Sequence, residues 1–151
     1  MQSSIRGRPG AAVQHFPDCH PRSWYYAQSL VSHAMWVDRW LQADNNQPMR
    51  TAYIEMVATE KISRRRGLAT AIMKRVADEI QDFDLATPSP FSVAYYERLD
   101  WQLWHGPLFI RTDSGVIPTP REEVMILRLP RTPNLNINDP LSAEWREGEL
   151  W

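Results

Sequence analysis

Features that mark several other classes of protein are missing from this chain of 151 residues. A single cysteine, Cys19, excludes an internal disulfide bond and fits a reducing compartment. No apolar run reaches the length of a membrane-spanning helix, and the first residues lack the apolar core of a signal peptide. The formal net charge of −1 gives no reason to expect nucleic acid or an anionic membrane as the partner. Together these absences favour a cytoplasmic protein that binds neither nucleic acid nor membrane.

Internal repeats and low-complexity tracts are also lacking, and the length suits one domain with a real core. Residues 1–22 are polar and broken by glycine and proline, so we expect an irregular arm there. Residues 23–151 are expected to form a single domain that includes a C-terminal tail. His15, Cys19 and His20 in the arm are too few to complete a zinc site, and no metal is expected.

The pattern of apolar residues predicts strands, a helix, a strand, a short helix and further strands, which is a mixed α/β architecture. Two or more antiparallel strands are expected between Trp24 and Trp40, with a break near residues 27–29. Further strands are expected over Thr51–Ala58, Leu85–Thr87, Leu108–Arg111 and Val124–Leu129. Helices are expected over Leu68–Ile80 and Phe91–Leu99, the second with Ser89 as its N-cap. A loop should separate the last two strands, and residues 130–151 are predicted to be a polar tail.

The most informative stretch is the basic turn Ser63–Ala69, between the strand Thr51–Ala58 and the following helix. The first amides of a helix have no partner within the helix, and its dipole adds partial positive charge there. Gly67 permits close approach of a ligand and the preceding arginines add cations, so the turn suits a phosphate or pyrophosphate. It has neither the Gly-Lys-Ser/Thr of a Walker loop nor a GxGxxG fingerprint. An ordinary basic helix start is the alternative.

Glu55 stands in the middle of the apolar strand, where a carboxylate costs free energy unless it is paired or faces a cleft. In a cleft it could take a proton from a substrate ammonium, directly or through water. Alternation places Tyr53, Glu55 and Val57 on one side of the strand, so a merely solvent-facing glutamate is the alternative.

The motif Arg64-x-x-Gly67-x-Ala69 after an apolar strand is similar to the acetyl-coenzyme A signature of the GCN5-related N-acetyltransferases (GNAT). The stretch from Ala94 to Trp101 resembles a second signature of this superfamily. In that signature a helical tyrosine faces the sulfur of the cofactor. The resemblance implies that Tyr96 protonates the departing thiolate, although a core-packing role and the adjacent Tyr95 are alternatives. Asp100 replaces the expected glycine, and aspartate tolerates the left-handed conformation better than most residues.

Further stretches resemble one group within this superfamily, the aminoglycoside 2′-N-acetyltransferases. They are Tyr53-Ile54-Glu55, Trp101–Pro107, Thr119-Pro120 with acids after it, and the ending Trp145–Trp151, whose terminal tryptophan is the most specific mark. The resemblance spans about Leu30 to Trp151 and implies the GNAT acyl-CoA N-acyltransferase fold, with a truncated or replaced N-terminal strand and helix. It also implies a homodimer and acetyl-coenzyme A as co-substrate.

The same resemblance implies a set of site residues. Those for the substrate are Glu55, Thr87, Arg121, Glu122, Glu149 and Trp151; those for coenzyme A are Val57, Ala58, Thr59, Arg64, Arg65, Arg66, Gly67, Leu68 and Ala69. At residue 121 the family tends to have an acid, so Arg121 is a departure. Independently of the family, a polycationic aminoglycoside needs several carboxylates, which the glutamates near the C-terminus could supply. A solvated acidic tail is the alternative.

The expected reaction is attack of an amine, the 2′-amine of an aminoglycoside, on the thioester of acetyl-coenzyme A. Glu55 would assist deprotonation, the amide of Val57 would hold the developing oxyanion, and Tyr96 would protonate the thiolate. Two alternatives remain open: the same chemistry on a polyamine, a metabolite or a protein amine, and a non-catalytic module that binds coenzyme A.

Overall fold

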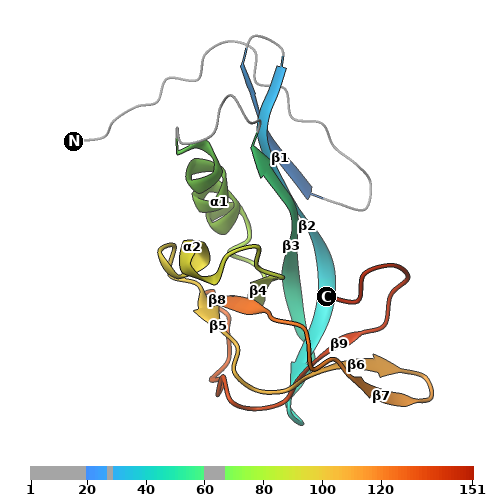
Figure 1. Cartoon of the computed structure of the whole chain (residues 1–151). Coiled ribbons are helices and arrows are strands. Elements are labelled where there is room, and N and C mark those ends of the chain that lie inside the picture. Colours follow the sequence, from blue (N-terminus) through green and yellow to red (C-terminus); the bar gives the residue numbers. More distant parts are fainter. Residues whose placement is uncertain (1–19, 27–28, 60–66) are drawn as a thin grey trace.

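A computed structural model of the chain describes residues 20–26, 29–59 and 67–151 (Figure 1). Within these ranges nine strands form a sheet in the order β5-β8-β4-β3-β2-β9-β6-β7, and β1 pairs with β2. The strands are β1 (His20–Tyr26), β2 (Ser29–Ala43), β3 (Met49–Thr59), β4 (Leu85–Pro88), β5 (Gln102–Leu103), β6 (Leu108–Thr112), β7 (Gly115–Pro118), β8 (Met125–Arg128) and β9 (Leu141–Glu144); the helices are α1 (Leu68–Glu79) and α2 (Val93–Glu97). The mixed α/β architecture is therefore confirmed.

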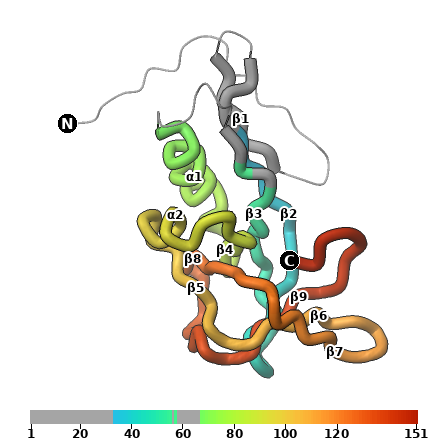
Figure 2. Tube along the Cα trace, in the orientation of Figure 1, coloured from blue at the N-terminus to red at the C-terminus, as the bar shows by residue number. Residues whose placement is uncertain are grey.

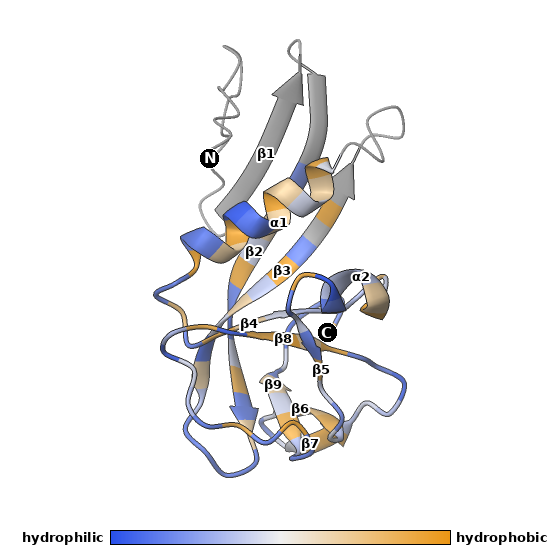
Figure 3. Cartoon of the chain, turned by 90° about the vertical axis from the view of Figure 1, so that its left-hand side faces the viewer, coloured by the Kyte–Doolittle hydropathy of each residue, from blue (hydrophilic) through white to orange (hydrophobic). Residues whose placement is uncertain are grey.

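Strand β3 is apolar along most of its length because both of its faces are covered. Ala52 and Ile54 belong to a core cluster with the buried face of α1, which lies alongside β2 and β3 (Figure 3). Met49 and Tyr53 point to the other side, into a second cluster that includes Trp151 at the end of the chain. A strand buried on both sides loses the alternation of polar and apolar residues, which explains the continuous run in the sequence.

Strands β3 and β4 run parallel and then separate. Their register extends from Thr51 opposite Leu85 to Ile54 opposite Pro88, and β3 continues alone to Thr59 on this side, within the part of the chain that is described. Pro88 has no N–H to extend the ladder. The two strands therefore open next to Glu55 and Val57.

A β-bulge lies at the same place on the other side of β3. His33 pairs with Ala58 and Met35 with Glu55, so two residues of β3, Met56 and Val57, oppose one residue of β2. A bulge takes one residue out of the ladder and redirects the local backbone. The backbone irregularity is thus centred on the residues that follow Glu55.

The prediction of a polar tail over residues 130–151 is wrong in its centre. Strand β9 inserts between β2 and β6, antiparallel to the first and parallel to the second. Leu141 and Ala143 are fully buried in the second core cluster. Beyond β9 the chain returns beside β2 and β3, where it ends (Figure 2). The sequence did not predict β9 because only Leu141 and Ala143 point inward, and two apolar residues among prolines and polar residues form too short a pattern.

Three smaller predictions are corrected as well. Strand β1 starts at His20, so residues 20–22 belong to the sheet and not to an arm. The expected loop before β8 contains β7, whose four residues are exposed and therefore show no alternation. Ser92, not Ser89, caps α2: its Oγ accepts a hydrogen bond from the Tyr95 amide at 3.3 Å. The left-handed conformation expected at Asp100 is confirmed, with φ of 68°.

Candidate active site

A cavity of about 430 Å³ opens where β3 and β4 separate. Its walls come from β3, from the β4–α2 connection, from α2 and from the C-terminal segment. The lining residues are Tyr53, Ile54, Glu55, Val57, Ser89, Phe91, Tyr96, Arg146, Glu147, Glu149 and Trp151. The cavity thus brings together five of the predicted site residues from three distant parts of the sequence: Glu55 and Val57, Tyr96, and Glu149 and Trp151.

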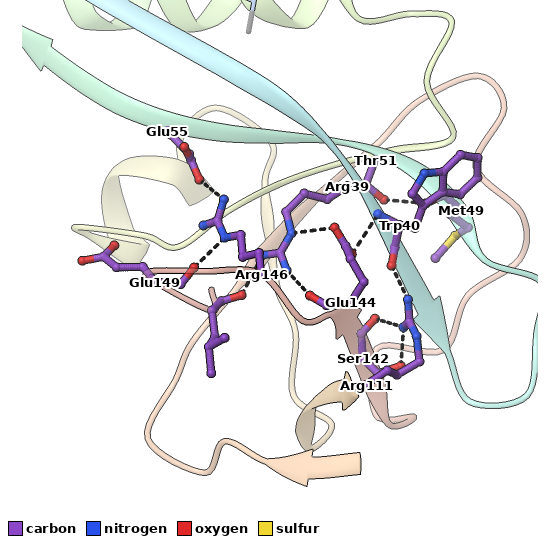
Figure 4. A network of polar contacts seen from close by, with 11 residues as sticks. Arg39, Trp40, Met49, Thr51, Glu55, Arg111, Ser142, Glu144, Arg146 and Glu149 are labelled. Carbon is purple, nitrogen blue, oxygen red and sulfur yellow. Dashed lines mark hydrogen bonds and ion pairs between the residues drawn. The ribbon is translucent and has the colours of Figure 1, made fainter. Parts of the chain in front are cut away.

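Glu55 faces this cavity and is paired there with Arg146 (Figure 4). Arg146 Nη1 donates to Glu55 Oε1 at 2.5 Å, and both side chains remain about one quarter exposed. Arg146 Nε donates to the Glu149 carbonyl, and its guanidinium lies 5.2 Å from the centre of the Tyr53 ring. Glu55 is therefore both paired with a cation and exposed to a cleft, the two arrangements that make a carboxylate tolerable in an apolar strand.

Tyr96 is the one of the two adjacent tyrosines that lines the cavity. It is 1% exposed, and its ring packs against Phe91, Tyr95 and Trp101. Burial is the main cause that raises the pKa of the Tyr96 phenol well above its usual value, with the neighbouring tyrosines adding to the effect. Tyr96 therefore keeps its proton at neutral pH and can act as a proton donor.

A buried arginine holds the C-terminal segment in place. Arg39 on β2 is 1% exposed and donates to the carbonyls of Glu144 and Leu150, each at 2.7 Å (Figure 4). Its Nε also reaches Glu144 Oε1 at 3.1 Å. One guanidinium thus fixes both ends of residues 144–150, which we call the C-terminal loop.

Trp151 closes the wall that this loop begins. It is 5% exposed, and its indole N–H donates to Thr119 Oγ1 at 2.9 Å. Glu147 and Glu149 of the C-terminal loop also line the cavity. The acidic end of the chain is therefore held by the buried Arg39 guanidinium and by the buried Trp151 indole. It is not a freely solvated tail.

Three predicted substrate residues lie elsewhere. Thr87 on β4 is fully buried and does not line the cavity, and its Oγ1 has no hydrogen-bond partner among the described residues. Arg121 is exposed. Glu122 is exposed and lines a separate hollow beside Trp104 and Thr119. The structure does not bring these three side chains to Glu55.

Thr87 is aligned with Tyr53 across the β3–β4 pair, and the Tyr53 hydroxyl is also buried without a partner within the described ranges. Burial raises the pKa of Tyr53 far above its usual value, although the nearby Arg39 and Arg146 act in the opposite direction. Each of these two buried hydroxyl groups is therefore a place where an ordered water could bind.

The predicted phosphate site is described in part. Gly67 precedes α1 with φ of 72°. Among the described residues no side chain caps the helix, and a Cβ added at Gly67 would meet none of their atoms within 4 Å. Leu68 and Ala69 form the first turn of α1, and Ala58 and Thr59 end β3. Arg64, Arg65 and Arg66 lie outside the described residues. The free amides and the open space at Gly67 are what an anion requires.

Sequence reasoning missed the two arginines that organise the site. Arg39 interrupts a strand pattern as Glu55 does, which was a usable signal for a buried, partnered charge. Arg146 lies among charged residues near the end of the chain, and no local feature marks it. No group of histidine, cysteine or acidic residues suited to a metal exists in the described ranges, and none of the helices there is long and apolar enough to cross a membrane.

The fold and the sequence together define the class of this protein. The chain matches the acetyltransferase (GNAT) domain family over residues 22–104, more than half of its length, and it belongs to that family. Among curated proteins it resembles an aminoglycoside 2′-N-acetyltransferase of Mycolicibacterium fortuitum, with 30% identity over 130 residues. The matched stretch covers 82% of this chain and 66% of the relative, slightly less than two thirds of its length.

Solved structures share the fold at low sequence identity. The GNAT family N-acetyltransferase YhbS from Escherichia coli, solved in complex with CoA, gives a TM-score of 0.53 at 14% identity and covers 80% of this chain and 62% of its own. Eis1 from Mycobacterium abscessus gives a TM-score of 0.52 at 17% identity and covers 58% of this chain and 22% of its own. The predicted GNAT fold is confirmed by these likenesses.

Proposed function

We propose that this protein is an acetyl-coenzyme A-dependent N-acetyltransferase whose substrate is an aminoglycoside, acetylated at its 2′-amine. The observation that carries the proposal is the single cavity at the β3–β4 opening, where Glu55 and Tyr96 both line the wall. A carboxylate and a protonated phenol are the proton acceptor and the proton donor that amide formation from a thioester requires. The chain's membership of the acetyltransferase family supports the same chemistry.

The described residues fit coenzyme A. The uncapped start of α1, with open space at Gly67, suits a pyrophosphate, and the separated strand β3 offers backbone groups over Val57, Ala58 and Thr59. Arg64, Arg65 and Arg66 precede that helix in the sequence, and we propose that they add cations to the same site. When bound, acetyl-coenzyme A supplies the acetyl group as an activated thioester.

Each protein group then has one task. Glu55 accepts a proton from the substrate ammonium, so that the free amine becomes nucleophilic. The amide of Val57, in the bulge beside the cavity, donates a hydrogen bond to the oxygen that gains negative charge. Tyr96 gives its proton to the departing sulfur, a role that its raised pKa permits at neutral pH.

The C-terminal loop supports an aminoglycoside as the amine. Glu147 and Glu149 bring carboxylates to the cavity, and Trp151 adds an indole. Several fixed anions beside an aromatic wall suit a polycation built from sugar rings. The likeness to an aminoglycoside 2′-N-acetyltransferase supports the same substrate. The homodimer stays a prediction.

The test is acetyl transfer from acetyl-coenzyme A to a panel of amines. The matched pair consists of two aminoglycosides that differ in carrying an amine or a hydroxyl at the 2′ position, with a polyamine and a lysine peptide beside them. Turnover of the 2′-amine compound alone is the expected result. Turnover of the polyamine or the peptide would show that the substrate is a different amine, while the proposed acetyl-transfer reaction would still hold. Binding of coenzyme A without transfer to any amine would indicate a non-catalytic module.

A further inference from the structure

Arg146 belongs to the C-terminal loop and links it to Glu55 on β3. Its Nη1 holds Glu55 Oε1, and its Nε holds the carbonyl of Glu149 in the loop. Glu55 Oε2 accepts no hydrogen bond from any described residue, so within that part of the chain Arg146 holds one carboxylate oxygen and the other has no partner. Arg146 therefore occupies one oxygen of the proposed base and leaves the second oxygen available to a substrate.

We propose that Arg146 is a positioning residue for acetyl transfer: its guanidinium fixes Glu55 through Oε1 and leaves Oε2 for the incoming amine. The proposal rests on the proposed function, because it assigns a second group to the same proton transfer. The guanidinium is itself held by its second contact, from Nε to the Glu149 carbonyl, so the charged hydrogen bond from Nη1 holds Oε1 at a defined place. An oriented base works better than a freely rotating one, since the proton must pass along a short, aligned hydrogen bond.

The charge of Arg146 has a second effect on the same step. A cation beside the cavity disfavours the protonated form of a substrate amine that is bound next to it. The other charged or titratable groups around this point are Tyr53 on β3, Arg39 on β2, Tyr96 on α2, and Glu144, Glu147 and Glu149 of the C-terminal loop. Loss of Arg146 should therefore move the acidic limb of kcat, which reports groups in the enzyme–substrate complex, to higher pH.

A simple anchoring role for Arg146 predicts a different outcome. Arg39 holds the carbonyls of Glu144 and Leu150, so both ends of the C-terminal loop stay fixed when Arg146 is replaced. If Arg146 served only to tie the loop at Glu149, its loss would raise the KM for the amine and leave the pH profile in place. The two roles can therefore be separated by measurement.

The decisive experiment is a double-mutant cycle between Glu55→Gln and Arg146→Gln, read as kcat/KM with the 2′-amine aminoglycoside. If Arg146 acts through Glu55, Arg146→Gln alone lowers kcat/KM by about tenfold, mainly in kcat. In the Glu55→Gln background the same change then costs little. Independent effects that multiply in the double variant would overturn the proposal, as would an Arg146→Gln enzyme with unchanged kcat.

The pH profile provides the second reading. Arg146→Gln should shift the acidic limb of kcat upward by about half a pH unit or more, whereas Arg146→Lys, which keeps the charge, should leave it close to that of the wild type. An unshifted limb in Arg146→Gln would contradict the charge effect. If Arg146→Gln does not fold, Arg146→Lys decides: a lower kcat with an unmoved limb supports orientation, and full activity overturns it.

Arg111→Gln is the matched control. Arg111 also donates to the same part of the sheet, to Ser142 and to the Trp40 carbonyl, but it does not line the cavity. Its replacement should leave the pH profile unchanged. A wild-type protein that acetylates no amine would refute the proposed function itself, whereas an active wild type with independent effects would refute the role of Arg146 alone.

Discussion

Replacement of Arg39 by methionine should both destabilise the protein and weaken its amine site. Methionine fills much of the buried space and removes the guanidinium. The carbonyls of Glu144 and Leu150 then lose their donors at the two ends of the C-terminal loop. The loop should loosen, and with it the position of Glu147 and Glu149 in the cavity wall.

The magnitude follows from three hydrogen bonds. The bond to Glu144 Oε1 contributes little, because that side chain is 37% exposed. Each of the two bonds to carbonyls should contribute about 1.5 kcal/mol, since the donor is charged and Arg39 is buried. The free energy of unfolding should therefore fall by about 3 kcal/mol, which corresponds to a drop in Tm of roughly 6–12 °C for a domain of this size.

Thermal unfolding and steady-state kinetics together provide the assay. We expect the KM for the aminoglycoside to rise several-fold, while the KM for acetyl-coenzyme A stays the same. Arg111→Met is the matched control, because the Arg111 side chain makes three hydrogen bonds in the same sheet and none to the C-terminal loop. The Arg111 carbonyl, which accepts from the Trp145 amide at 2.9 Å, is kept in the variant. It should lower Tm and leave both KM values unchanged.

Two results would refute this reasoning. A Tm of Arg39→Met within about 2 °C of the wild type would show that the clamp adds almost nothing to stability. Equal changes in the aminoglycoside KM for Arg39→Met and Arg111→Met would show that general loosening of the sheet, and not release of the loop, controls the site.

Three further outcomes are expected. Gly67→Val should weaken binding of coenzyme A in calorimetry, because its side chain enters the space before α1, whereas Gly115→Val, at another glycine with positive φ and open space, should lower stability without that loss. Tyr96→Phe should lower kcat and kcat/KM together by roughly 2–4 orders of magnitude at most, whereas Tyr95→Phe should do little; equal effects would contradict the role of Tyr96. Because burial raises the Tyr96 pKa, wild-type kcat should not decline at mildly alkaline pH through loss of that proton. Deletion of Trp151 should lower stability by about 3–5 kcal/mol and raise the aminoglycoside KM, an effect that high salt reduces; unchanged kinetics in a folded truncated chain would remove the C-terminus from the site.

The sequence by itself determined the elements whose signals are local. Strand β3 and helix α1 were predicted within two residues of their ends, because continuous apolar residues and a helical period are properties of neighbouring positions. Glu55 stood out because a carboxylate interrupts an apolar strand. Tyr96 came from the resemblance to the family, and the structure places it, with Glu55, in the cavity wall.

Tertiary structure decided everything that depends on distant pairing. Arg146 meets Glu55 across 91 positions, and Arg39 meets Leu150 across 111. Strand β9 has only four residues, and its place between β2 and β6 is set by partners far away in the chain. Nothing in the sequence near a long-range partner records the contact, because the free energy of such a pair arises only when the sheet brings both groups together and removes them from water. The chemistry of the site could thus be predicted from local patterns, whereas the wall that would select its substrate exists only in the folded chain.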